Sequence, residues 1–297
     1  IADSARDIDF AMRWGFGTKQ GPFELWQQAG WKQVSQWIMA HIDAGKTLSS
    51  APLPAWVFDG REGVHSGEGS WSAAQNKKLP KSTLPVYSRQ AFPESVGAAA
   101  DPRKSGTEEF KNEEIRVWTA DGEVLIASIT AKLHLISPAV TEGLVKAVEI
   151  AEAKYQGLVI WSPDDVFSAG ANLEALLPVF MKLGAKGIKP EEKKLQDAML
   201  RIRYAQVPVV SSMRGLALGG GCELAVHCAR RVAHMETYIG LVEVGVGLVP
   251  GAGGTLRLPR VLGVETALNM IVSGEPVGSE LLASQPGQKL FDKIIDG

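Results

Sequence analysis

Two glycine-rich turns, each expected between a strand and a helix, are the first features of this 297-residue chain that suit chemistry. One contains Ala169-Gly170-Ala171 and the other contains Gly219-Gly220-Gly221. Such a turn exposes backbone N–H groups at the start of a helix, and these groups attract negative charge. Two of them aimed at one oxygen would form an oxyanion hole. The same spacing also serves tight packing of a helix on a strand, so spacing alone leaves both interpretations open.

Two glutamates accompany these turns. Glu223 lies in the first turn of the helix predicted over 219–228, and Glu243 lies among the apolar residues of 239–244. A carboxyl group in apolar surroundings has a raised pKa and can act as a general acid near neutral pH. Two carboxyl groups in different environments can divide the acid and base roles. Taken alone, a glutamate at a helix start also serves as a surface charge that stabilises the helix dipole.

Composition and motifs exclude several other classes of function. The net charge is −2, without the basic excess expected of a nucleic-acid binder. The two cysteines fit a reducing compartment and are too few for a disulfide framework or, unaided, for a zinc site. No Walker A loop and no G-x-G-x-x-G turn is present, and no run of about 20 apolar residues predicts a membrane span. We expect no metal site.

Strands alternate with helices from residue 115 onward, which predicts an α/β domain with parallel strand pairing. A hairpin is expected first, over 115–118 and 124–129, with a turn at Asp121-Gly122. The further strands are predicted at 158–161, 207–211 and 231–234, and the helices at 138–154, 173–183, 191–204 and 219–228.

The first part of the chain differs in composition, because six of the eight tryptophans fall within the first 71 residues. Helical spacing predicts helices over 7–12 and 26–42, with the aromatic residues packed in a core. The proline-rich stretch 46–112 is predicted to be a linker or peripheral subdomain with short strands at 55–58 and 84–87. Since the chain starts at Ile1 inside a helix-like segment, we expect a fragment of a longer polypeptide.

Three motifs in order make residues 115–275 resemble the crotonase superfamily, the enoyl-CoA hydratase and isomerase family. Residues 167–171 (FSAGA) look like its first oxyanion turn, and residues 217–225 (ALGGGCELA) look like its second. Residues 250–258 (PGAGGTLRL) match a further segment of the family. The resemblance implies an α/β, crotonase-like fold, a spiral of ββα units, here preceded by a small helical N-terminal segment.

The resemblance also implies roles for individual residues. The backbone N–H groups of Ala171 and Gly220 would hold the thioester oxygen of an acyl-CoA. Glu223 would deprotonate the water that adds to C3, and Glu243 would deliver the proton to C2. Isomerases of the family often keep only one of these acids, so the pair favours hydration. The residues implied in substrate binding are Ala169, Gly170, Gly219, Gly251 and Lys132.

The stretch 132–137 (KLHLIS) departs from the Asn-Ala-Leu run that family members often carry. Lys132 is either a contact for a CoA phosphate or an ordinary solvent-exposed lysine. His134 is interpreted as a packed polar residue and not as a catalyst.

A second resemblance covers residues 1–45. Asp7-Ile8-Asp9, Gly15-Phe16-Gly17 and Gly21-Pro22-Phe23 look like the C-terminal helical domain of 3-hydroxyacyl-CoA dehydrogenases. It implies a remnant of that domain over 1–45, the linker over 46–112 and a C-terminally truncated hydratase domain over 113–297. The NAD-binding domain of the dehydrogenase would precede Ile1, so NAD would serve only that missing part.

Together these observations predict the enoyl-CoA hydratase part of a bifunctional fatty-acid β-oxidation enzyme. The predicted reaction is the reversible hydration of a trans-2-enoyl-CoA, for which no cofactor is needed. The alternatives are a Δ3,Δ2-enoyl-CoA isomerase and a non-catalytic acyl-CoA-binding module. The expected partner is an acyl-CoA thioester, with no nucleic acid and no membrane span, and a homo-oligomer is compatible with this interpretation. The expected location is a bacterial-type cytoplasm, with mitochondria or peroxisomes as the alternatives.

Overall fold

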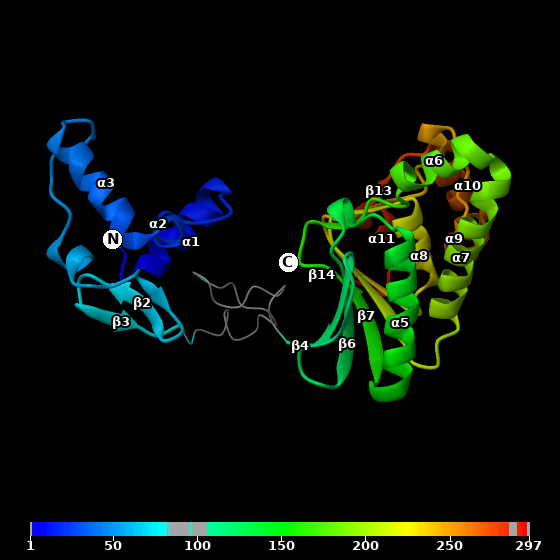
Figure 1. Cartoon of the computed structure of the whole chain (residues 1–297), viewed down its shortest axis with the longest axis horizontal. Coiled ribbons are helices and arrows are strands. Elements are labelled where there is room, and N and C mark those ends of the chain that lie inside the picture. The colour runs from blue at the N-terminus through cyan, green and yellow to red at the C-terminus, as the bar shows by residue number, and fades with distance from the viewer. Residues whose placement is uncertain (1, 82, 84–95, 97–105, 285–289, 296–297) are drawn as a thin grey trace. The chain divides into compact units, whose positions relative to one another are not determined.

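A computed structural model describes residues 2–81, 83, 96, 106–284 and 290–295 (Figure 1). The chain divides into two compact units, Ile1–Lys104 and Ser105–Gly297. The strand expected at 84–87 lies outside the described residues. No helix among the described residues is long and apolar enough to cross a membrane.

The first unit combines helices with a small antiparallel sheet of order β1-β2-β3. Trp31 is buried at the centre of its apolar core, stacks on Trp26 at a centroid distance of 4.3 Å, and donates its Nε1–H to the Val57 carbonyl at 3.0 Å. The elements are α1 (Ala5–Phe16), α2 (Pro22–Gln28), α3 (Trp31–Asp43), the 3-10 helix η1 (Ala55–Phe58), β1 (His65–Ser66), β2 (Gly69–Ser72) and β3 (Lys77–Leu79).

Three predictions for this unit were wrong in part. The helix expected over 26–42 is two helices, because Gly30 takes a φ of +100° between α2 and α3. The stretch expected as a strand over 55–58 is the 3-10 helix η1, in which Val57 N–H donates to the Pro54 carbonyl. Trp14 and Trp37 are 57% and 54% exposed and therefore do not belong to the aromatic core.

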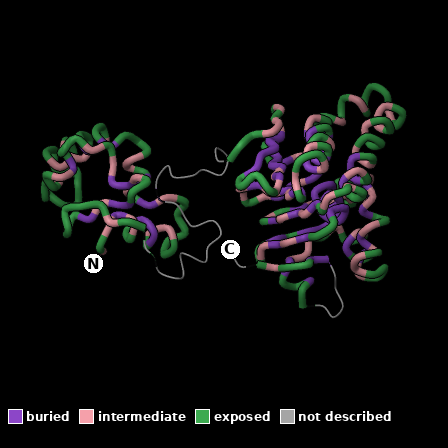
Figure 2. The backbone as a smooth tube through the Cα atoms, turned by 90° about the horizontal axis from the view of Figure 1, so that it is seen from below, coloured by how far each residue is buried: buried purple, intermediate pink, exposed green. Residues whose placement is uncertain are grey.

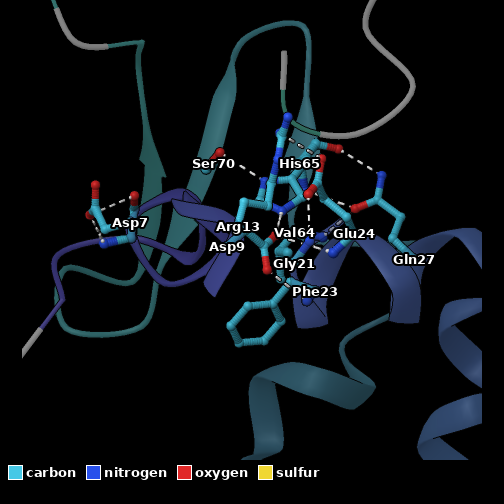
Figure 3. Close-up of polar contacts among 11 residues, drawn as sticks. Asp7, Asp9, Arg13, Gly21, Phe23, Glu24, Gln27, Val64, His65 and Ser70 are labelled. Atoms are coloured by element: carbon cyan, nitrogen blue, oxygen red, sulfur yellow. Dashed lines mark hydrogen bonds and ion pairs between the residues drawn. The ribbon is translucent and has the colours of Figure 1, made fainter. Parts of the chain in front are cut away.

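A buried polar cluster joins the helices of the first unit to its hairpin (Figure 3). His65 Nε2 lies 2.6 Å from Asp9 Oδ2, and its Nδ1 lies 2.9 Å from Ser70 Oγ. The Asp9 carboxylate also accepts the backbone N–H groups of Phe23 and Glu24, the second and third residues of α2. Asp9 therefore satisfies donors at the start of α2 that lack partners within the helix.

The second unit is built on a seven-stranded sheet of order β14-β11-β9-β7-β6-β5-β4. The β5–β6 hairpin is antiparallel, whereas β6, β7, β9, β11 and β14 pair in parallel. β4 lies within the stretch predicted as a linker, yet it pairs with β5 as the edge of this sheet. The strands are β4 (Thr107–Lys111), β5 (Ile115–Thr119), β6 (Val124–Ile129), β7 (Gly157–Trp161), β9 (Val209–Met213), β11 (Arg230–His234) and β14 (Lys293–Ile295).

A second, four-stranded sheet of order β13-β12-β10-β8 carries the glycine-rich turns. Its strands β8, β10 and β12 pair in parallel, so their carboxyl ends lie at one edge. The strands are β8 (Val166–Ser168), β10 (Leu216–Leu218), β12 (Tyr238–Gly240) and β13 (Val277–Gly278). This sheet is formed by short strands that hydrophobic patterning does not reveal.

Helices flank these sheets, and α5 lies along the strands β5, β6 and β7 (Figure 1). Buried residues concentrate in the strands of the main sheet and on the facing sides of the helices (Figure 2). The predicted hairpin and the helices over 138–154 and 173–183 are confirmed, while the helix expected at 191–204 begins earlier, at Ala185. The helical elements are η2 (Lys132–His134), α5 (Pro138–Lys154), α6 (Leu173–Leu183), α7 (Ala185–Arg203), α8 (Gly220–His227), η3 (Glu243–Val246), α9 (Gly254–Leu262), α10 (Val264–Ser273) and α11 (Ser279–Ala283).

Candidate active site

The two predicted turns lie against each other, because β8 and β10 are parallel neighbours and each turn follows the end of its strand. Gly170 has a φ of +103°, and a Cβ atom there would lie 3.0 Å from the Leu218 carbonyl oxygen. A Cβ atom on Gly220 would lie 3.2 Å from the Ala171 nitrogen. Glycine is therefore required at Gly170 by both backbone conformation and space, and at Gly220 space is tight.

The N–H groups of Ala171 and Gly220 are the candidate oxyanion donors. Among the described residues, neither donates a hydrogen bond to a backbone or side-chain acceptor. Gly220 is the first residue of α8, where an N–H has no partner within the helix. The two donors are thus close together and available to one external acceptor, which is the arrangement an oxyanion requires.

Both turns line a cavity of about 810 Å³, a size typical of small-molecule sites. Residues of α5, α6 and α7 form one side, and η3 with the segment that follows it forms another. All predicted site residues except Lys132 line this cavity, namely Ala169, Gly170, Ala171, Gly219, Gly220, Glu223, Glu243 and Gly251. The structure leaves Lys132 exposed on η2, outside the lining.

Glu223 is 2% exposed, and its Oε1 accepts the Gly254 N–H at 2.8 Å. The pKa of this carboxyl group is raised from 4.5 to about 7, mainly by burial and in smaller part by the negative charge of Glu243, while the hydrogen bond from the Gly254 N–H opposes the rise. The group therefore exchanges protons near neutral pH, as a general acid or base must.

Glu243 begins η3 and faces the second turn, since a Cβ atom on Gly219 would lie 3.2 Å from its Oε1. Its Oε2 is buried and has no hydrogen-bond partner among the described residues. Burial raises the pKa of this carboxyl group as well. The pair consists of one carboxyl group held by a backbone N–H and one with an oxygen left unpartnered in the site.

Helix α7 supplies two residues near the site that the sequence did not indicate, Glu192 in the cavity lining and Gln196 behind it. Gln196 donates its Nε2–H to the Gly251 carbonyl at 2.7 Å, which ties α7 to the segment that holds Glu223. Glu192 lines the cavity beside Gly251, where a Cβ atom would lie 2.4 Å from its Oε1. Only the predicted helix over 191–204 pointed to this region, because neither residue belongs to a recognisable motif.

Asn172 N-caps α6, its Oδ1 accepting the Ala175 N–H at 3.1 Å. It thereby sets the direction in which the chain leaves the first turn. Within the described parts of the chain, no group of three or more His, Cys, Asp or Glu side chains is arranged to hold a metal ion.

The sequence profile of the enoyl-CoA hydratase/isomerase family matches residues 131–285, which contain both turns and both glutamates. This chain belongs to that family. Its second unit has the crotonase fold: a crystal structure of an enoyl-CoA hydratase from Bacillus anthracis superimposes with a TM-score of 0.56 at 25% identity, covering 62% of this chain and 70% of that one.

Longer proteins are related to this family member over part of their length. A probable 3-hydroxyacyl-CoA dehydrogenase from Bacillus subtilis is 32% identical over 270 residues, covering 87% of this chain and 31% of that protein. A peroxisomal bifunctional enzyme from Cavia porcellus is 39% identical over 148 residues, covering 49% of this chain and 19% of that protein. The 270-residue match is longer than the second unit, so it extends into the first.

Proposed function

We propose that this chain carries the enoyl-CoA hydratase activity of a fatty-acid β-oxidation enzyme. The observation that carries the proposal is that one cavity holds two backbone N–H groups without an acceptor among the described residues, together with the buried Glu223 and the half-buried Glu243, both of raised pKa. The substrate would be a trans-2-enoyl-CoA, and the product the 3-hydroxyacyl-CoA. The reaction needs donors, an acid and a base, and no cofactor.

The N–H groups of Ala171 and Gly220 would receive the thioester carbonyl oxygen. As water adds to C3, electron density moves through C2 to this oxygen and creates an enolate-like negative charge. Donors that are already oriented stabilise this charge without rearrangement, and one such donor typically contributes about 10²–10³ in kcat. The flanking backbone is held by β8 and β10, so the donors keep their positions.

Glu223 would orient the water and take its proton, and Glu243 would deliver a proton to C2. Two nearby carboxyl groups with raised pKa values favour a state that shares a single proton, because mutual repulsion opposes ionising both. One ionised and one protonated carboxyl group is the state this reaction starts from. Because Oε2 of Glu243 has no hydrogen-bond partner among the described residues, a proton on this oxygen would be available to a substrate in the cavity.

The first unit supports a proposal about the longer protein. We propose that residues 1–45 are the remnant of a 3-hydroxyacyl-CoA dehydrogenase domain and that the parent protein oxidises the hydration product with NAD. The match to the Bacillus subtilis protein extends into this unit, which supports the proposal. Hydration and oxidation would then be consecutive reactions of one polypeptide, located in a bacterial-type cytoplasm.

The test compares Glu223→Gln and Glu243→Gln with the parent in hydrating a short 2-enoyl-CoA, followed by loss of the conjugated thioester absorbance. Each variant should lower kcat/KM by about 10²–10⁴, the range of general acid–base catalysis. The double variant should lose less than the product of the single losses, because the two groups act as a unit. Glu265→Gln, an exposed glutamate on α10, is the matched control and should match the parent.

A 3-enoyl-CoA substrate distinguishes hydration from isomerisation. If one glutamate variant is nearly silent and the 3-enoyl substrate turns over faster than water adds to the 2-enoyl isomer, the activity is that of an isomerase. If the parent binds the thioester and turns over neither substrate, the chain is an acyl-CoA-binding module.

A further inference from the structure

Two consecutive residues of η2 adopt a backbone conformation that is costly for residues other than glycine. Leu133 has a φ of +53° and His134 a φ of +50°. Such a conformation is unfavourable for a residue with a side chain and persists only where its surroundings hold it in place. Leu133 is exposed, so the packing of its side chain does not hold the turn, whereas His134 is 5% exposed.

The imidazole of His134 is held from three sides. Its Nδ1 lies 2.5 Å from the Val166 carbonyl oxygen, which only accepts, so Nδ1 carries a proton and donates. Its Nε2 lies 3.1 Å from Asp164 Oδ2 and 3.3 Å from Ser162 Oγ. All three partners belong to the connection between β7 and β8 or to the start of β8. The ring therefore attaches the left-handed turn to the strand that leads into the first oxyanion turn.

The carbonyl groups of the left-handed turn hold the beginning of the oxyanion turn. Leu133 O accepts the Ala169 N–H at 3.1 Å, and His134 O accepts the Ser168 hydroxyl at 2.7 Å. Ser168 Oγ in turn accepts the Gly170 N–H at 3.2 Å. A right-handed backbone at residues 133 and 134 would rotate both carbonyls away from these donors.

Ile136 holds the other side of the same turn. Its N–H donates to the Gly170 carbonyl at 2.8 Å, and its carbonyl accepts the Asn172 N–H at 3.0 Å. Every N–H from residue 169 to residue 172 except that of Ala171 thus has an acceptor in this network. The Ala171 N–H is therefore the group of this turn that can donate a hydrogen bond into the cavity.

We propose that His134 is a positioning residue of the oxyanion hole: its ring holds the Leu133–His134 turn, whose carbonyls orient the backbone that presents the Ala171 N–H. This inference rests on the proposed hydratase function and adds a residue that does not touch the substrate. Its effect is expected on the polarisation of the thioester carbonyl and on kcat, more than on KM.

The experiment uses the whole chain and four variants, of which Ser168→Ala is described below. His134→Leu removes the donor to Val166 O, and His134→Asn keeps an N–H donor and a residue type that tolerates positive φ. His41→Leu, an exposed histidine of α3, is the matched control. The probe is butyryl-CoA labelled with ¹³C at the carbonyl, whose stretching frequency is read by isotope-edited infrared difference spectroscopy of the bound thioester. Turnover of crotonyl-CoA provides kcat and KM.

We expect the parent and His41→Leu to lower the bound carbonyl frequency equally. His134→Leu should lose most of this shift and about 10² in kcat, the cost typical of a misplacement near 1 Å, with KM much less affected. His134→Asn should recover part of both. Ser168→Ala, which removes the hydroxyl linking His134 O to Gly170 N, should lose part of the shift and serves if His134→Leu does not fold.

The outcomes distinguish the positioning role of His134 from the proposed hydratase function. Folded His134→Leu with the parental carbonyl shift and kcat overturns the positioning role, as does an unchanged shift in Ser168→Ala if His134→Leu is unfolded. A parent protein that neither shifts the carbonyl frequency nor hydrates crotonyl-CoA overturns the proposed function, and the positioning role with it. Equal losses in kcat and binding, without recovery in His134→Asn, indicate a purely structural role and also overturn the proposal.

Discussion

Glu223→Gln should change the pH dependence of stability in a way that follows from the burial of this side chain. The carboxyl group is 2% exposed, and its Oε1 accepts the Gly254 N–H at 2.8 Å, a hydrogen bond that a glutamine oxygen can equally accept. Burial raises the pKa from 4.5 to about 7, and each pKa unit corresponds to about 1.4 kcal/mol. Ionised Glu223 therefore costs the folded state about 3 kcal/mol.

The direction of the effect follows from proton linkage. Between pH 4.5 and about pH 7 the folded state keeps the proton that the unfolded state has lost, so the free energy of unfolding falls as pH rises. The contribution is fully present below pH 4.5 and is lost once the pH exceeds 7. Glutamine does not titrate, so its contribution to the free energy of unfolding does not change with pH. The stability of Glu223→Gln relative to the parent should therefore rise by about 3 kcal/mol from low to high pH, with most of the rise between pH 5 and pH 8.

Urea unfolding of both proteins, followed by tryptophan fluorescence at several pH values, measures this difference. The first unit and its six tryptophans are identical in both proteins, so differences between the curves arise in the second unit. Glu265→Gln, with its exposed side chain, should follow the parent at every pH. A stability difference between Glu223→Gln and the parent that is the same at pH 5 and pH 8 would refute the reasoning.

Two further changes test the structure. Gly170→Ala should lower kcat for 2-enoyl-CoA hydration by about 10²–10³, because its Cβ would lie 3.0 Å from Leu218 O at a φ of +103° and displace the oxyanion turn; activity equal to the parent would contradict this. His65→Ala should destabilise the first unit by about 1–3 kcal/mol, because the buried Asp9 loses one of its hydrogen-bond partners. Thermal unfolding measures this, with the exposed His41→Ala as the control, and equal midpoints for the two variants would contradict it.

Several parts of this protein could be predicted from the local sequence pattern. The hairpin over 115–118 and 124–129 and the helix from Pro138 to Lys154 could be read from hydrophobic periodicity and turn residues, because their faces are set by spacing alone. The glycine-rich turns could also be predicted from the sequence. Gly170 and Gly219 have positive φ angles and little space for a Cβ atom, so these positions favour glycine. Both glutamates were found beside them.

Local pattern was insufficient where a residue's state depends on contacts distant in sequence. The helix expected across 26–42 is interrupted at Gly30, and Trp37 is exposed although the aromatic residues of this stretch were predicted to pack in a core. Whether a given tryptophan is buried depends on which other elements pack against it, and hydrophobic periodicity does not contain this information. β4 belongs to the main sheet because β5 offers it an edge, not because its own sequence favours a strand.

The assembly of the site depends on contacts between segments that are far apart in the sequence. Ala171 and Gly220 are distant in sequence and meet because β8 and β10 are parallel neighbours in a sheet of short strands. Lys132 and His134 are two residues apart, yet one side chain is exposed and the other is enclosed by Ser162, Asp164 and Val166. The pKa of Glu223 likewise depends on burial and on the charge of Glu243, which the folded chain brings near. Composition and spacing indicate which groups can react. The burial that shifts their pKa values and the orientation of the N–H donors arise only when distant segments pack together.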